Sequence, residues 1–215
     1  MRNSFLFCFL SFAVCAFGQH YKLYKTQNYH NQLRLNTSTG EVVQIQDDGQ
    51  MWLVTEPFES TEESDNRFRL YETQNMWTFI ELDTYTGRTW QVQYSAKSPD
   101  EMFAIPIESE YLGIAKEPRF RLYGTQNMWT FIELDTYTGK IWQLQYSLKN
   151  DNTRFIIPIN SDHLNYTFEN VFDIQPMTSM YQYYLINTKT GEMWQFQWNT
   201  KPDKGDKTYR WIKKL

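Results

Sequence analysis

The sequence is poor in cysteine. Its 215 residues include only Cys8 and Cys15, and both lie within residues 1–18. Residues 19–215 therefore lack a thiol, which excludes a disulfide, a cysteine-ligated metal and a cysteine nucleophile from that part of the chain. A domain without disulfides must be stabilised by its hydrophobic core, and residues 19–215 are numerous enough to form one.

A long apolar run is also missing. The most apolar stretch, residues 5–17, follows the single cation Arg2 and is too short to span a membrane. Together with the small residue Gly18 it is typical of a secretory signal peptide over residues 1–18, cleaved after Gly18, so we expect a secreted or periplasmic protein. The alternative, a lipid anchor on Cys15, is disfavoured because Val14 stands where a small residue is needed.

Several chemistries lack their usual residues. The chain has 21 Lys and Arg against 25 Asp and Glu, for a net charge of −4, and no basic stripe, so nucleic acid is not an expected partner. No two of the three histidines, His20, His30 and His163, have metal-ligand spacing. Neither a nucleophile elbow nor a glycine-rich phosphate loop occurs, and we expect no cofactor and no metal.

Aromatic residues are abundant, at 18% of the chain, and they recur in a repeat. Residues 75–95 and 127–147 are nearly identical, and two more distant copies emerge when the chain is aligned on four Thr-Gly pairs. The alignment predicts four units, at approximately residues 20–66, 67–118, 119–167 and 168–215. The four aligned glycines are Gly40, Gly87, Gly139 and Gly191.

Each unit is predicted to contain four short strands. The connection between the second and third strands is a hairpin, in which Gly139 offers a positive φ angle and Asp135 accepts backbone N–H groups. Pro106 and Pro158 cannot donate to a sheet, so the fourth strand should lie at an edge. In the third unit the strands are expected over residues 119–124, 128–135, 140–147 and 154–160, with a Thr-Gln-Asn turn at 125–127.

These features predict an all-β fold, a small β-propeller of four four-stranded antiparallel blades. A single sheet of this kind cannot bury both faces, whereas sheets packed against one another can. The expected ring closes by packing of the first blade against the last. A β-barrel or a tandem β-sandwich is the alternative architecture.

The hairpins resemble the repeats of quinoprotein-type (PQQ-like) propellers, which read roughly L-D-x-x-T-G-x-x-x-W. The matching segments are Leu82–Gly87 with Trp90 and Leu134–Gly139 with Trp142, with the tryptophan one residue closer to the glycine. The resemblance implies a blade but no quinone or metal ligands. The overall style also resembles repeat proteins of Bacteroidetes envelopes.

Two sets of repeated residues are assigned to the core. The tryptophans of the third strands occupy its apolar face, so we expect them to pack between blades rather than to stack on sugars. The neighbouring glutamines are expected to make hydrogen bonds inside blade interfaces. The set, with the turn glycines, is Trp90, Trp142, Trp194, Gln91, Gln143, Gln195, Gly40, Gly87, Gly139 and Gly191.

The candidate ligand-binding residues are Tyr85, Arg88, Tyr137 and Lys140. They lie at hairpin tips, and an aromatic residue beside a cation is typical of a recognition surface. Packing within the turn is the competing interpretation for the tyrosines. The linkers vary most between units and are further candidates, at residues 59–66, 109–118 and 160–170.

The sequence predicts a non-catalytic binding or scaffolding protein, with an envelope protein or a glycan as its partner. No catalytic residue is assigned, because Glu81 and Glu133 are repeated rather than unique. The alternative is a polysaccharide-active hydrolase or lyase, for which His30 with Asp47 and Asp48 is the one faint candidate. A third hypothesis is a purely structural protein that spaces its partners.

Overall fold

The computed structural model describes residues 20–58, 64, 66–107, 117–148, 153–160, 169, 171–200 and 211–215. The predicted signal peptide lies outside these residues, as do nearly all of the three linkers. The described chain forms four four-stranded antiparallel sheets, and the prediction of four antiparallel blades is confirmed. The connection between β7 (Thr89–Gln93) and β8 (Phe103–Ile107) contains a short 3₁₀ turn, η1 (Pro99–Glu101).

Each sheet is a meander in which consecutive strands pair. The first contains β1 (Tyr21–Lys25), β2 (Asn31–Asn36), β3 (Val42–Gln46) and β4 (Met51–Thr55). The second contains β5 (Phe68–Glu72), β6 (Thr78–Asp83), β7 (Thr89–Gln93) and β8 (Phe103–Ile107). The third contains β9 (Phe120–Gly124), β10 (Thr130–Asp135), β11 (Ile141–Gln145) and β12 (Phe155–Pro158). The fourth contains β13 (Phe172–Pro176), β14 (Gln182–Asn187), β15 (Met193–Gln197) and β16 (Trp211–Lys214).

The second hairpin of every sheet turns at its repeated glycine. The φ angles of Gly40, Gly87, Gly139 and Gly191 lie between 68° and 76°, a region that glycine adopts without a steric penalty. Asp135 accepts a hydrogen bond from the backbone N–H of Tyr137 at 3.0 Å, as the sequence predicts. Local sequence therefore determines this turn.

The Thr-Gln-Asn turns join the first and second strands and are capped by their own side chains. The Thr125 hydroxyl donates to the carbonyl of Thr130 at 2.9 Å, and Asn127 Oδ1 accepts from Trp129 N at 2.9 Å. The intervening glutamines reach the next sheet instead: Gln27 Nε2 donates to the carbonyl of Thr73 at 3.0 Å. These turns thus terminate hairpins and also tie adjacent sheets together.

The fourth strands lie at sheet edges, as the prolines predict. Pro106 on β8 and Pro158 on β12 belong to strands that pair on one side only, so the missing N–H groups interrupt no ladder.

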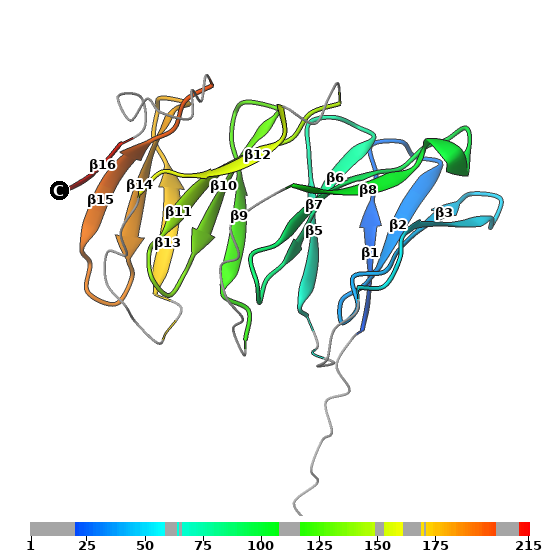
Figure 1. The fold of residues 1–215 in the computed structure, drawn as a ribbon, viewed down its shortest axis with the longest axis horizontal. Coiled ribbons are helices and arrows are strands. Elements are labelled where there is room, and N and C mark those ends of the chain that lie inside the picture. The colour runs from blue at the N-terminus through cyan, green and yellow to red at the C-terminus, as the bar shows by residue number, and fades with distance from the viewer. Residues whose placement is uncertain are drawn as a thin grey trace, which may run out of the picture.

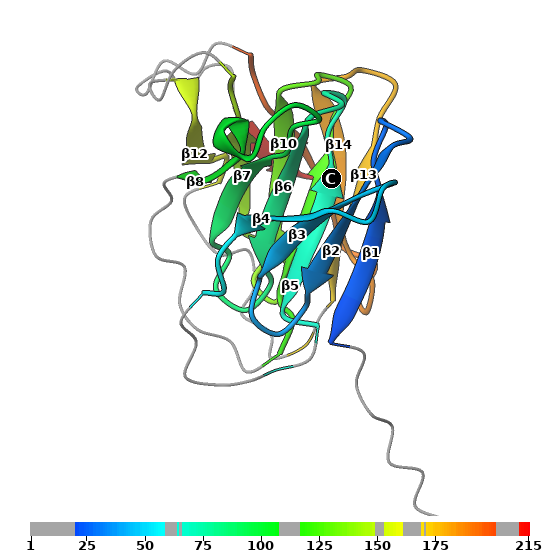
Figure 2. The same cartoon turned by 90° about the vertical axis from the view of Figure 1, so that its right-hand side faces the viewer.

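The four sheets pack face to face in chain order and form an open row. Figure 1 shows the first sheet at one end and the fourth at the other, and Figure 2 looks onto the first sheet. Packing joins β2 to β5, β6 to β9 and β10 to β13. The expected closure of the ring by the first and last blades of one chain is wrong, because these two sheets lie at opposite ends of the row.

The core is divided into three clusters, one at each junction between neighbouring sheets. The last cluster places Ile132, Leu134 and Ile141 of the third sheet against Phe172 and Trp194 of the fourth. The other two clusters have equivalent composition at the first and second junctions. Each blade is therefore stabilised through its neighbours, since a single sheet cannot bury both of its faces.

Candidate functional site

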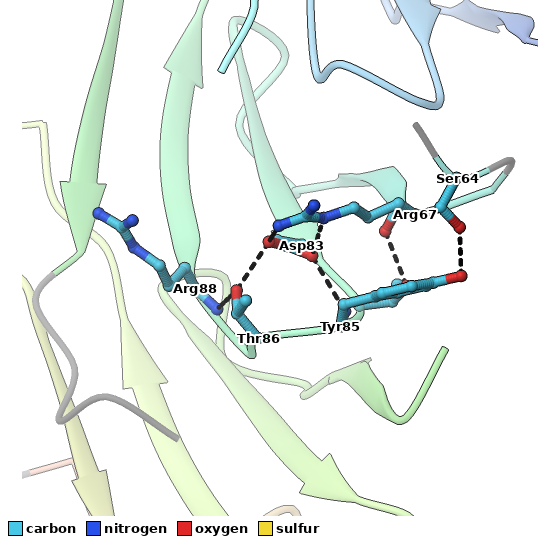
Figure 3. A network of polar contacts seen from close by, with 7 residues as sticks. Ser64, Arg67, Asp83, Tyr85, Thr86 and Arg88 are labelled. Carbon is cyan, nitrogen blue, oxygen red and sulfur yellow. Dashed lines mark hydrogen bonds and ion pairs between the residues drawn. The ribbon is translucent and has the colours of Figure 1, made fainter. Parts of the chain in front are cut away.

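The hairpin tip of the second blade is organised around the buried carboxylate of Asp83 (Figure 3). Arg67 makes two parallel hydrogen bonds to it, from Nε to Oδ1 at 3.0 Å and from Nη2 to Oδ2 at 2.7 Å. Tyr85 N donates to Oδ1 at 3.0 Å, and the Thr86 hydroxyl donates to Oδ2 at 2.8 Å. Four donors thus hold one carboxylate, which fixes the shape of the tip.

The third blade repeats this network. Arg119 Nε donates to Asp135 Oδ1 at 2.6 Å, and its Nη2 donates to Oδ2. The Thr138 hydroxyl donates to the same carboxylate at 2.5 Å. The outer blades have Asn36 and Asn187 in place of the aspartate.

The two candidate tyrosines are held by the tips that carry them. Tyr85 is only 8% exposed; its ring centroid lies 5.6 Å from the Arg67 guanidinium and its hydroxyl bonds to Ser64 (Figure 3). Tyr137 is half-buried, 5.4 Å from the Arg119 guanidinium, and donates to Glu117. Both rings therefore pack against the arginine of their own blade, as in the competing interpretation of packing within the turn. Burial and the carboxylate of Glu117 raise the pKa of Tyr137 to about 12.

The candidate cations are more accessible. Arg88 is exposed, and its guanidinium lies 5.5 Å from the ring centroid of Trp90. Lys140 is half-buried, with its ammonium 5.2 Å from the ring centroid of Trp142. Figure 3 shows Arg88 pointing away from the Asp83 network. Both cations thus stand over a buried tryptophan at the same rim of the row.

The repeated tryptophans and glutamines lie at the junctions between sheets. Trp90, Trp142 and Trp194 are between 3% and 6% exposed. Gln143 Nε2 donates to the carbonyl of Asn199 in the next sheet at 2.6 Å, and Gln91 Oε1 accepts from Ser147 N at 3.3 Å. Gln195, in the last sheet, pairs instead with Gln182 of its own sheet, because the described residues contain no following sheet.

Glu81 and Glu133 occupy an unusual position. Both are fully buried, and neither carboxyl has a hydrogen-bond partner among the described residues. Burial, and secondarily the neighbouring charges of Asp83 and Asp135, raise the pKa of both carboxyls well above the ordinary value. Burial in a blade junction thus favours the protonated form of both carboxyls.

The faint catalytic candidate is an exposed pair in the first blade. His30 Nδ1 lies 2.7 Å from Asp47 Oδ2, and the ring of Tyr29 lies 3.8 Å from the imidazole, centroid to centroid, at an interplanar angle of 43°. Asp48 does not join them, since its carboxylate accepts from Gln50 N in its own turn. Within the described ranges no group of three or more His, Cys, Asp or Glu is arranged to hold a metal ion.

Sequence analysis missed a hollow at the opposite rim, of about 370 Å³. Asn75 and Trp77 line it from a Thr-Gln-Asn turn, and Lys97, Glu101 and Leu148 line it from the connections between third and fourth strands. The Asn-Met-Trp sequence after each middle turn was the available signal, because it places an aromatic side chain beside a polar turn.

None of the helical segments described is long and apolar enough to cross a membrane. The linkers 109–118 and 160–170 fall almost wholly outside the described residues, and of linker 59–66 only Ser64 and Asn66 are described. Their role as candidate recognition loops stays a prediction.

No protein-family model matches the chain, and no curated protein matches its sequence. Among solved structures, it is similar to a proposed 6-phosphogluconolactonase of Bacteroides uniformis, at 16% identity and a TM-score of 0.47, over 89% of this chain and 55% of that one. It is also similar to an auxiliary nutrient binding protein of Bacteroides thetaiotaomicron, at 7% identity and a TM-score of 0.47, over 90% and 46%. A second proposed 6-phosphogluconolactonase, from Bacteroides fragilis, matches at 14% identity and a TM-score of 0.45, over 90% and 55%.

The chain thus spans about half the length of the solved structures that it matches. All three structures come from species of Bacteroides. None of them is described as a quinoprotein, so the resemblance of the hairpins to that repeat stays a prediction.

Proposed function

We propose that this protein is a non-catalytic binding or scaffolding protein of the secreted or periplasmic space, which recognises an envelope protein or a glycan. Recognition uses the rim formed by the second hairpins, with Arg88, Lys140 and Tyr137 as the contacting residues. Tyr85 supports the rim from within and makes no contact of its own.

One observation carries this proposal: the two middle tips present cations on a backbone that is already fixed. Four donors hold Asp83, so the tip loses little conformational entropy when a partner binds. Arg88 and Lys140 occupy equivalent positions on adjacent blades, which gives a repeated positive site for an acidic partner. The solved structures of similar shape include one binding protein and two proposed lactonases, so they favour neither class.

Charge reversal at both tips tests the proposal. The double variant Arg88→Glu, Lys140→Glu should lose its partners from an envelope extract and its signals on an array of acidic and neutral glycans. The matched control is Lys97→Glu, an exposed cation at the opposite rim, which should keep both. Unchanged partners in the double variant would remove the hairpin rim from consideration.

A polysaccharide-active enzyme is the second candidate, and the pairing of His30 with Asp47 is the observation that favours it. A histidine held by a carboxylate can act as a general base. His30→Ala should abolish turnover of a soluble polysaccharide if this candidate is correct, and should leave glycan or protein binding at the hairpin rim intact if it is not.

A further inference from the structure

The first and last sheets each have one face that no other described sheet covers. In β2 the buried apolar residues are Leu33 and Leu35, whereas in β14 they are Tyr183 and Leu185, which belong to the opposite face of the repeat. The middle strands β6 and β10 are buried on both faces. The two uncovered faces are therefore unlike, and each corresponds to one side of an internal junction.

We call the uncovered face of the first sheet the head face (Figure 2). Strand register places Leu23, Arg34, Val43 and Leu53 in one row across it. It exposes large apolar side chains, which soluble monomers rarely gather on one surface. These are Tyr21 (55% exposed), Leu23 (60%), Met51 (58%) and Leu53 (45%).

The head face uses the positions that are buried at the internal junctions. Leu23 aligns with Leu70 and Leu122, which are 5% and 6% exposed. Tyr21 aligns with Phe68 and Phe120, each 1% exposed. In the second and third sheets these positions pack against the preceding sheet.

The uncovered face of the fourth sheet, the tail face, has the complementary set. In the third sheet the positions that receive the next sheet are Ile132, Leu134, Ile141 and Ile159. Leu215 corresponds to Ile159, because Leu215 N bonds to Met193 O as Ile159 N bonds to Ile141 O. Leu215 is 62% exposed, whereas Ile159 is 8% exposed. The tail face thus consists of Tyr184, Ile186, Met193 and Leu215.

The surroundings of the turn glycines also show that no sheet covers the tail face. A Cβ atom on Gly40 would lie 2.5 Å from Phe58 and 2.9 Å from Glu81 Oε1, and one on Gly139 would lie 3.1 Å from Phe172. A Cβ atom on Gly191 would meet nothing within 4 Å. The last turn therefore lacks the neighbour that covers these two earlier turns.

Charge is complementary across the two faces. Arg34 aligns with Glu81, the residue that reaches Gly40 at the first junction. A head face docked on a tail face would bring Arg34 to Gly191, next to Glu192, whose carboxylate pairs with Lys214 in the single chain and would be shared between the two cations. In the single chain Arg34 pairs with Glu41 at 3.2 Å and lies 5.2 Å from the ring centroid of Tyr21, and its Nε has no hydrogen-bond partner among the described residues.

We propose that two copies of this chain dock head face to tail face and close a ring of eight blades. Two identical junctions close the ring, because a head-to-tail interface forms a closed ring when the rotation between successive copies adds up to a full turn. Eight blades lies within the usual range for propellers. Gln32 and Val43 replace the Phe79 and Trp90 of the internal junctions, so the junction between copies is weaker than those within a chain and forms reversibly. This proposal is independent of the function proposed above.

The test is the mass in solution as a function of concentration, by light scattering and sedimentation equilibrium. Leu23→Glu on the head face and Leu215→Glu on the tail face should each weaken association at least tenfold, because each places a carboxylate in an apolar junction. Both side chains are exposed in the single chain, so circular dichroism and thermal unfolding should show an intact fold. Leu148→Glu is the control, because it makes the same replacement at an exposed leucine of the rim, outside both faces, and should associate like the wild type.

Mixing separates this arrangement from others. The Leu23→Glu variant keeps an unchanged tail face, and the Leu215→Glu variant keeps an unchanged head face. A mixture of the two variants can pair these unchanged faces and should therefore form dimers that neither variant forms alone. A wild type that stays monomeric at every concentration would overturn the proposal, as would loss of association from the head variant only, which indicates head-to-head pairing. Masses that grow beyond two copies would overturn the closed ring, and so would a mixture that remains monomeric.

Discussion

The two middle blades and the two outer blades differ in how much of their surface is buried. Strands β6 and β10 are buried along their whole length, whereas β2 and β14 alternate. A strand packed on both faces has no position at which a substitution is free of contacts. The two nearly identical copies, residues 75–95 and 127–147, contain these doubly buried strands.

The same comparison holds for charge. Each middle blade buries two carboxyls. In the second blade these are Asp83, which pairs with Arg67, and Glu81, which has no hydrogen-bond partner among the described residues. At the position of Glu81 the outer blades have Arg34 and Leu185. Arg34 lies on the uncovered face of the first sheet, whereas Leu185 is buried in the intact junction between the third and fourth sheets, so a buried glutamate at this position is a feature of the middle blades only.

The sharpest test of this comparison is one substitution at two equivalent leucines. Leu122→Ala should lower the free energy of unfolding by about 2–5 kcal/mol, because it leaves a cavity in a full junction. Leu23→Ala should change it by less than about 0.5 kcal/mol under conditions in which the chain is a monomer, because that side chain is 60% exposed. Urea unfolding followed by tryptophan fluorescence measures both, and equal losses would contradict the burial difference.

The bidentate pair of a middle blade should come next in size. Asp83→Asn copies the outer blades and keeps an acceptor for the turn, but removes the negative charge to which Arg67 makes two hydrogen bonds. The expected cost is about 1.5–3 kcal/mol, the worth of hydrogen bonds to a charged group.

Asn187→Asp is the control for the charge itself. The aligned position that would supply the arginine is Val171 in the fourth blade, so the new carboxylate gains no equivalent partner and should not stabilise the chain. A gain comparable to the loss at Asp83 would show that the aspartate acts within its turn and not through the arginine.

The turn glycines give a smaller contrast. Gly191→Ala should cost about 1–2 kcal/mol, the strain of a Cβ atom at a positive φ angle. Gly40→Ala carries the same strain and must also displace Phe58 and Glu81, which adds about 1–3 kcal/mol of overpacking. Thermal and urea unfolding of the two variants should separate them, and identical stabilities would mean that the first turn is not covered by the second sheet.

The pH dependence is expected to be the mildest effect. Because burial raises the pKa of Glu81 and Glu133, the folded chain keeps two protons that the unfolded chain loses above an ordinary value of 4.5. Their contribution to the free energy of unfolding therefore falls as the pH rises from 4.5 through the raised pKa values. The double variant Glu81→Gln, Glu133→Gln should flatten this decline, so its gain over the wild type should be larger at about pH 8 than at about pH 5.

Urea midpoints at the two pH values measure this gain. Leu185 occupies the same position in the last blade, so Leu185→Gln is a matched control that adds an amide where no carboxyl titrates. A gain that is the same at both pH values would show that the two carboxyls are already ionised in the folded chain.

The local sequence pattern predicted the hairpin between the second and third strands correctly. The aspartate, the threonine and the left-handed glycine of each hairpin act within a few residues, so their roles follow from spacing. Strand ends were less accurate: the second strand of the third unit begins at Thr130, not at residue 128, because Asn127 caps a turn that includes Met128 and Trp129.

The candidate site was predicted only in part. Spacing found the hairpin tips, but the burial of Tyr85 depends on Arg67 and Ser64, which lie 18 and 21 residues away and approach only in the folded chain. The hollow beside Trp77 joins the second blade to Leu148 of the third, so no local pattern could reveal it.

The amino-acid sequence is enough to define the repeated unit of this protein, a four-stranded meander with a fixed hairpin that occurs four times. Each of those features is set by contacts between near neighbours along the chain. The tertiary structure alone decided that the row stays open within one chain and that its two ends expose opposite faces. Those properties depend on how successive sheets pack, and each packed junction is formed by side chains about fifty residues apart in the chain.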